Sequence, residues 1–395
     1  METTQKVRIE SIDLLRGAVI ILMALDHVRM FFGQGSFYAD PTDLNTTTTL
    51  LFLTRWITHF CAPVFIFLAG MSAYFYGAHQ HSTRQLSRYL LKRGLWLVFL
   101  ELVIVNFAWT FDITFSFHFL QVIWAIGLSM VVLAILVYLP KWAILAFGIV
   151  MVFGHNLLDP IQVDGTSASA LLWYILHQEE LVYFAPDSAV YFHYPLIPLM
   201  GLMALGYLFG TLYQPEVSAI KRRNWLLWIG MAAILLFMIL RGFNLYGEPN
   251  PWSIQPTSVD TVLSFLNTTK YPMSLHFLLM TIGPALVFLA LTEGVKNRLG
   301  DILLTFGTVS LFFYIVHIYL IHLLAFVAIV ISGRPWTDYI ITAEDFMQQT
   351  TGDFGFDLWV VYLVWALVLM VMYPLSKWYR AFKKGHPEIR LLAYI

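Results

Sequence analysis

Long apolar stretches alternate with short polar segments along almost the whole chain. A membrane-crossing helix needs about 20 apolar residues to span about 30 Å of hydrocarbon, and ten stretches approach that length. They lie near residues 13–32, 57–77, 90–110, 117–139, 141–158, 193–213, 223–243, 271–293, 307–332 and 357–379. This pattern predicts an all-α fold: a polytopic bundle of about ten transmembrane helices, forming one integral membrane domain over residues 1–395.

The first stretch, Ser11–Phe32, carries charge at both ends. Nine uncharged residues separate Arg16 from Asp26, and His27 follows directly. Ionisable groups in a membrane helix are costly unless they are paired or face a wet cavity, so they indicate function by default. Arg16 and His27 are eleven residues apart, about three turns and about 16 Å, and therefore share one helix face. That face can connect chemistry at the two membrane surfaces.

Composition supports the membrane prediction. Of the 395 residues, 59% are hydrophobic and only 12% are charged, against about 25% charged in soluble proteins. No basic domain is present, which argues against nucleic acid as a partner. The single cysteine, Cys61, rules out an internal disulfide and a cysteine-based metal cluster.

Loop charges predict the topology. Eighteen of the 23 Lys and Arg residues collect in alternate loops, including Lys6 and Arg8, the 78–93 loop, residues 221–223 and the tail that ends with Arg390; the loops between these are mostly acidic. The positive-inside rule then places both termini in the cytoplasm.

Several ionisable residues fall at one level of this topology. Asp26 and His27 end the first span on the outer side, and His59 lies at that level in the second, whereas His317 lies near the centre of the ninth, one turn from Tyr314. A histidine at a span end is often only an interfacial residue with a wet tip. No spacing supports metal binding by His27 and His59, so no metal is expected.

The basic cluster Arg84, Arg88, Lys92 and Arg93 has two interpretations. It is either a topology signal or a site for the phosphates of a cytosolic nucleotide. The chain contains no GxSxG, GxxxxGK[ST] or HExxH motif and no GxGxxG that opens a helix, so no soluble-enzyme signature competes with the membrane interpretation.

Three segments resemble a known family. They are SIDLLRGAVIILMALDH from residue 11, TRWITHFCAPVFIFLAG at 54–70 and LFFYIVHIYLIH at 311–322. These segments resemble the bacterial relatives of heparan-α-glucosaminide N-acetyltransferase, within the superfamily of transmembrane acyltransferases. The resemblance implies transfer of an acyl group from cytosolic acetyl-CoA to an acceptor beyond the membrane, such as an amino sugar or another glycan. It also implies a multi-pass protein of a bacterial cytoplasmic (inner) membrane and makes a homodimer plausible.

One departure from the family bears on catalysis. The lysosomal enzyme carries a catalytic histidine in the loop before its second span, but residues 33–55 contain none. The catalytic imidazole is then expected to be His27 or His59. The resulting hypothesis makes His27 the base or an acyl-accepting nucleophile, lets Asp26 assist it and assigns His59 to the oxyanion or the acceptor.

In the same hypothesis, acyl-CoA binds basic residues at the cytoplasmic surface and its pantetheine chain runs between the spans. The expected contacts are Arg16, Arg84, Arg88, Lys92, Arg93, Tyr314 and His317.

Two other functions remain open. In a proton-coupled transporter, Asp26, His27, Glu101 and His317 would form a relay, although the chain has no internal repeat of the kind that many transporters show. A non-catalytic polyprenyl- or glycan-binding protein would keep the outer cleft without needing basic residues at the cytoplasmic surface.

Overall fold

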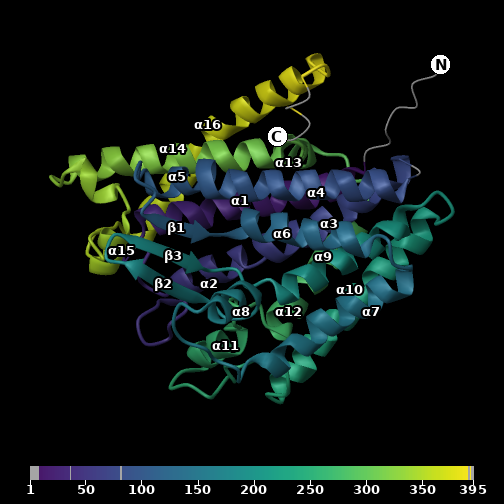
Figure 1. Cartoon of the computed structure of the whole chain (residues 1–395), viewed down its shortest axis with the longest axis horizontal. Coiled ribbons are helices and arrows are strands. Elements are labelled where there is room, and N and C mark those ends of the chain that lie inside the picture. Colours follow the sequence, from purple (N-terminus) through teal and green to yellow (C-terminus); the bar gives the residue numbers. More distant parts are fainter. Residues whose placement is uncertain (1–8, 36, 81, 390–391, 393–395) are drawn as a thin grey trace.

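A computed structural model describes residues 9–35, 37–80, 82–389 and 392. Lys6, Arg8 and Arg390, which contribute to the predicted topology, lie outside the described residues. The fold is a helical bundle with one small sheet (Figure 1). The helical elements are α1 (Glu10–Phe32), α2 (Thr49–Thr58), α3 (Cys61–Gln80), α4 (Thr83–Leu100), η1 (Glu101–Val105), α5 (Asn106–Thr110), α6 (Val122–Leu136), α7 (Lys141–Gly154), η2 (His155–Leu158), α8 (Ala168–Leu176), α9 (Ile197–Phe209), η3 (Gly210–Tyr213), α10 (Ala219–Gly242), α11 (Ser258–Leu266), α12 (Leu275–Leu291), α13 (Arg298–Gly307), α14 (Ser310–Ile331), η4 (Trp336–Tyr339), α15 (Ala343–Gln348) and α16 (Leu358–Gly385).

A helix overlaps each of the ten predicted spans. Within the described part of the chain, five helical segments are long and apolar enough to cross a membrane: Thr49–Gln80, Lys141–Leu158, Ala219–Gly242, Ser310–Ile331 and Leu358–Gly385. Three further apolar helices are shorter, namely Val122–Leu136, Ile197–Tyr213 and Leu275–Leu291. The protein is therefore mostly helical and has the features of a multi-pass membrane protein, while the count of ten spans stays a prediction.

The sheet is a correction to the predicted span at 117–139. Residues Phe117–Leu120 form β1, which pairs in parallel with β3 (Ser188–Phe192), and β3 pairs antiparallel with β2 (Glu180–Ala185). The Asn106 side chain makes two bonds to β1: Nδ2 donates to the carbonyl of Phe117, and Oδ1 accepts from the N–H of Phe119. A short, mostly apolar segment suits a buried strand as well as a helix, and the pairing with β3 selects the strand.

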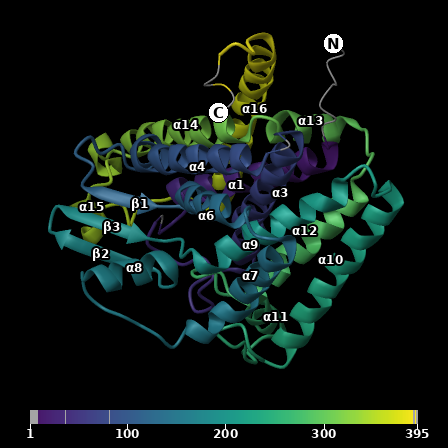
Figure 2. The ribbon, with the colours of Figure 1, turned by 45° about the vertical axis from the view of Figure 1, so that its right-hand side comes forward.

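Helix α1 is the central element. It packs against α3, α13, α14 and α16, and all but a few of its side chains are buried. Close approach to α13 depends on Gly17, since a Cβ there would overlap the backbone carbonyl of Leu303. Gly70 of α3 makes a similar close approach to Met203 of α9. Figure 2 shows α10 and α12 side by side at the edge of the bundle, where α12 also contacts α1.

The two ends of the bundle differ. At the end where α1 begins, α3 turns into α4. At the end where α1 finishes, here called the cavity end, the three strands and α15 gather (Figure 1). Two main-chain hydrogen bonds join distant chain segments there. The N–H of Phe356 donates to the carbonyl of Phe32, and the N–H of Ile341 donates to the carbonyl of Thr110. This covering layer encloses the candidate site.

Candidate functional site

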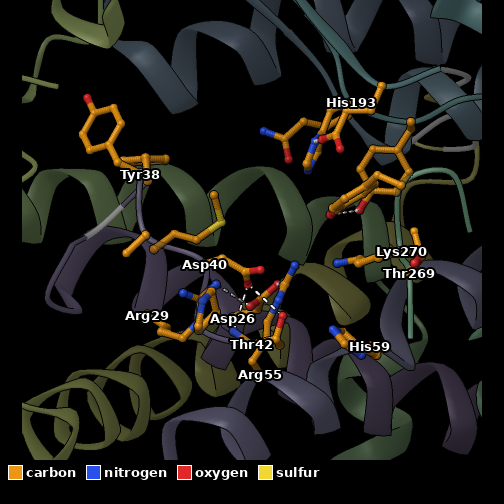
Figure 3. A pocket seen from close by; sticks show the side chains of 18 of the residues that line it. Asp26, Arg29, Tyr38, Asp40, Thr42, Arg55, His59, His193, Thr269 and Lys270 are labelled. Carbon is orange, nitrogen blue, oxygen red and sulfur yellow. Dashed lines mark hydrogen bonds and ion pairs between the residues drawn. The ribbon is translucent and has the colours of Figure 1, made fainter. Parts of the chain in front are cut away.

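A cavity of about 510 Å³ opens at the cavity end; we call it the main cavity. Its walls come from α1 and the loop after it, from α2, from β1 and β3, and from the segment before α12. Its volume falls in the range of about 300–1,000 Å³ that small-molecule sites occupy. Figure 3 shows Asp26, Arg29 and Arg55 grouped together, with His59 and Lys270 to one side and His193 across the space.

His27 and His317 form the buried centre of the site. Nδ1 of His27 lies 2.8 Å from Nε2 of His317, and the rings stack with centroids 5.0 Å apart. The edge of Trp109 packs against His27 at a centroid distance of 5.0 Å, and Tyr314 packs against it at 5.9 Å. The structure thus brings together three predicted residues, His27, Tyr314 and His317, from opposite ends of the sequence.

A backbone carbonyl sets the tautomers of this pair. Nδ1 of His317 lies 2.8 Å from the carbonyl oxygen of Phe313, which can only accept, so this nitrogen carries a proton. In neutral His317, Nε2 is then the acceptor, and His27 must donate from Nδ1. Nε2 of neutral His27 is left as the basic nitrogen, and His27 lines the main cavity. This is the protonation pattern that a general base requires.

Asp26 has partners other than the predicted one. Its Oδ1 accepts from Nη2 of Arg29 at 3.1 Å, and its Oδ2 accepts from Nη1 of Arg55 at 2.6 Å (Figure 3). The contact to Nδ1 of His27 comes from His317 instead, and the assistance that Asp26 is expected to give His27 stays a prediction. Two guanidinium groups around one carboxylate leave a net positive charge beside His27, which suits a developing oxyanion.

His59 also reaches the main cavity. It is buried, and its ring packs on that of Phe277 with centroids 5.0 Å apart. Among the described residues its Nδ1 has no hydrogen-bond partner. An unpaired buried donor or acceptor is uncommon in proteins and fits a group that meets a ligand.

The opposite wall is one that the sequence did not predict. Glu179 accepts a 2.7 Å bond from the Tyr191 hydroxyl and lies 2.5 Å from Nδ1 of His193. Burial and the neighbouring carboxylate raise the pKa of Tyr191 well above its usual range, so Tyr191 stays a donor. The His193 ring lies over that of Tyr271 with centroids 3.7 Å apart, and Lys270 lines the same wall.

The predicted cofactor residues other than Tyr314 and His317 lie toward the other end. Arg16 donates to Asp13 at 2.9 Å and to the Ser72 hydroxyl at 3.2 Å. In α4, the side chains of Arg84, Arg88 and Lys92 are exposed, and Arg93 is half-buried. A second cavity of about 230 Å³ at this end is bordered by Thr83 and Lys141. The structure therefore separates the two predicted sets of residues along the bundle.

Glu101 takes a structural position. It begins η1 and its Oε2 accepts from the backbone N–H of Trp124 at 3.1 Å, in the first turn of α6. Carboxylates at helix N-termini satisfy otherwise unpaired N–H groups. With Asp26 held by two arginines and Glu101 at a helix start, these contacts give no support to a proton relay.

Comparison with protein-family models decides the family. The model described as heparan-alpha-glucosaminide N-acetyltransferase, catalytic, matches residues 8–246, which is more than half of the chain. The chain belongs to this N-acetyltransferase family. A second model, described as OpgC protein, matches residues 166–352. No curated protein matches the chain.

Membership in the N-acetyltransferase family indicates a membrane acyltransferase. The matched part includes Asp26, His27 and His59, together with the basic cluster of α4. His317 falls in the OpgC match, so the His27 to His317 contact joins the two matched regions.

Proposed function

We propose that this protein transfers an acetyl group from acetyl-CoA to a carbohydrate acceptor, with His27 as the general base. The observation that carries the proposal is the 2.8 Å contact between His27 and His317 at the edge of the main cavity. Family membership supplies the reaction class, and the contact supplies a base of defined protonation.

The reaction needs one proton acceptor and one anion stabiliser. An acceptor hydroxyl or amine attacks the thioester carbonyl while Nε2 of His27 takes its proton. The new C–O or C–N bond forms, the C–S bond breaks, and the proton passes from His27 to the leaving thiolate. His317 keeps the His27 ring in its tautomer throughout. An acetyl-His27 intermediate is the two-step version of the same transfer.

Positive charge near His27 supports stabilisation of the tetrahedral intermediate. Arg55 and Lys270 both line the main cavity, and Asp26 neutralises only part of the charge of the two neighbouring guanidinium groups. Preorganised charge of this kind is often the largest single contribution to catalysis. His59, with its unpaired Nδ1, adds a further group on the same side.

The lining of the main cavity favours a carbohydrate acceptor. Its charged side chains balance, with Asp26, Asp40 and Glu179 against Arg29, Arg55 and Lys270. A balanced set of donors and acceptors suits a ligand rich in hydroxyl groups. Tyr191, Tyr194 and Tyr271 add aromatic rings on which a sugar can stack. The Glu179 carboxylate would also accept a hydrogen bond from the nitrogen of an amino sugar.

The donor is proposed to bind from the end where α1 begins. Arg84, Arg88, Lys92 and Arg93 would hold its phosphates, because guanidinium and ammonium groups are the usual phosphate partners. Its acyl end would reach His27 along the line of Arg16, Tyr314 and His317. In this proposal that end faces the cytoplasm of a bacterial cell and the main cavity faces outward.

The function is tested with purified protein in proteoliposomes and acetyl-CoA labelled in the acetyl group. We expect label to appear on a member of a panel of amino sugars and neutral glycans, with release of one CoA thiol per acetyl transferred. Binding of a glycan without thiol release would favour a binding protein. Proton flux without thiol release would favour a transporter, and either result would overturn the proposal.

A further inference from the structure

A second cluster of ligating side chains lies apart from the main cavity. His155 of η2, Asp159 directly after it and His177 at the end of α8 offer ring nitrogens and a carboxylate oxygen that all lie within 4.8 Å of one another. None of the three lines the main cavity, and the acyl-transfer mechanism does not use them. We infer that this cluster is a site for a divalent transition-metal ion, with zinc as the ion that its ligands suit best.

The nitrogens of His155 are the strongest sign of a missing ligand. His155 is only 2% exposed, yet neither Nδ1 nor Nε2 has a hydrogen-bond partner within the described ranges. Nδ1 of buried His177 is also unpaired among these residues. Buried polar atoms almost always have a partner. A metal ion would satisfy a nitrogen of His155 that nothing else in this part of the chain reaches.

The ligand atoms lie within 4.8 Å of one another, so small side-chain movements would bring them to the spacing that zinc needs. Bonds of about 2.0–2.1 Å in a tetrahedral site place ligand atoms about 3.4 Å apart. Nε2 of His177 lies 3.0 Å from Oδ1 of Asp159, a hydrogen bond that a shared metal ion would replace. Two imidazoles and a carboxylate are ligands that zinc commonly accepts, whereas magnesium and calcium prefer oxygen alone.

Neighbouring groups hold the ligands in place. Nδ2 of Asn156 donates to the second oxygen of Asp159 at 2.8 Å, and the Trp173 ring packs against His177 at a centroid distance of 5.4 Å. Such supporting contacts are a regular feature of metal sites. The Asp159 side chain keeps 20% of its surface exposed, which gives an ion access and leaves the fourth position to water.

The ion would link the segment after α7 to the segment after α8. His155 and Asp159 follow α7, whereas His177 follows α8 and precedes Glu179 of the main cavity by two residues. Metal binding would therefore steady the start of β2 and the Glu179 side of the cavity. This is a positioning role that is independent of the identity of the acetyl acceptor.

The test measures bound metal directly and does not depend on transfer activity. Full-length, tag-free protein in detergent is stripped with a chelator, incubated with zinc chloride, desalted and analysed for zinc by mass spectrometry. We expect about one zinc ion per wild-type chain, and at least a tenfold lower zinc affinity for His155→Gln, His177→Gln and Asp159→Asn. His118→Gln, a change in a half-buried histidine outside both sites, should retain zinc like the wild type.

Cobalt gives a second measurement that needs no variant. Co²⁺ at a four-coordinate nitrogen and oxygen site absorbs strongly in the visible range, and zinc should displace it. Failure of folded wild-type protein to retain zinc, or equal zinc retention by all three ligand variants, would overturn the inference. A six-coordinate cobalt spectrum in the wild type would contradict the proposed geometry.

Discussion

His27 and His317 are 290 positions apart in the chain, and their facing ring nitrogens lie 2.8 Å from each other. The contact holds because α1 and α14 pack together and because the Phe313 carbonyl fixes the proton on the far side of His317. A neutral imidazole thus takes the orienting role that a carboxylate plays in hydrolase triads. It supports His27 without placing a negative charge next to it.

Substitution of His317 tests this orienting role. His317→Phe removes the acceptor for the His27 proton, and we expect kcat to fall about 10- to 100-fold, less than the loss expected for the base itself. His317→Gln keeps an amide oxygen as acceptor and should recover part of that rate. Steady-state kinetics should show the change in kcat with little change in the acceptor KM. Equal activity of the two variants would contradict the role.

The ion pairs among Asp26, Arg29 and Arg55 predict that substitutions at these residues change stability non-additively. Asp26→Asn leaves two guanidinium groups without their carboxylate, and Arg55→Met leaves Asp26 with one partner; each should cost about 3–5 kcal/mol. The double variant should cost clearly less than the sum of the two. Unfolding measurements on the wild type and all three variants form the cycle. Additive losses would show that the charges act independently.

The environment of Asp112, at the cavity end, predicts that the stability of the protein depends on pH. Burial by itself raises the pKa of Asp112, but hydrogen bonds from Thr114 and Ser116 outweigh it and lower the pKa below its ordinary value. A lowered folded pKa contributes stability above the unfolded value of about 3.9, and that stability is lost as the pH falls through the folded value.

The measurement is the melting temperature of Asp112→Asn against wild type from pH 7 to pH 3. We expect the variant to be less stable by about 1–3 kcal/mol at pH 7, since an amide cannot accept all of these bonds. The difference should shrink below about pH 4. Asp187→Asn, in the exposed turn between β2 and β3, is the matched control and should change little. A gap that persists at pH 3 would contradict the assignment.

The basic cluster of α4 predicts weaker donor binding when it is neutralised. Removing two exposed charges, each contributing about 0.2–1 kcal/mol, should weaken acetyl-CoA binding by Arg84→Ala/Arg88→Ala about 2- to 30-fold. Lys221→Ala/Arg223→Ala removes the same charge from the exposed start of α10 and should leave the Kd unchanged. Calorimetric titration compares the two pairs. Equally weakened acetyl-CoA binding in both double variants would mean that any loss of positive charge has this effect, which would contradict a specific phosphate site on α4.

Much of the site could be predicted from the sequence because the charged residues of α1 stand out in a long apolar stretch. Charged residues at both ends of one apolar stretch pointed to His27, and the level of His59 followed from counting spans. Glu179, His193 and Lys270 were missed because they reach the cavity through tertiary contacts. The parallel register that pairs Phe117 with Ala189 joins segments 72 positions apart, and no local pattern encodes it.

The same limit explains why the sequence did not predict the metal cluster. His155 begins η2 and Asp159 follows four residues later, which is a spacing that places two ligands close together. His177 follows only after a loop and α8, and its approach depends on how α8 packs. The Asp26 to Arg29 pair spans three residues within α1, but the approach of Arg55 to Asp26 needs the packing of α1 with α2.

The most direct test of the central claim is single-turnover acetyl transfer by His27→Gln beside the wild type, with acetyl-CoA affinity measured on the same samples. We expect an unchanged Kd for acetyl-CoA and a transfer rate lower by about 10²- to 10⁴-fold, the usual contribution of a general base. A His27→Gln protein that transfers acetyl at the wild-type rate would show that His27 is not the base.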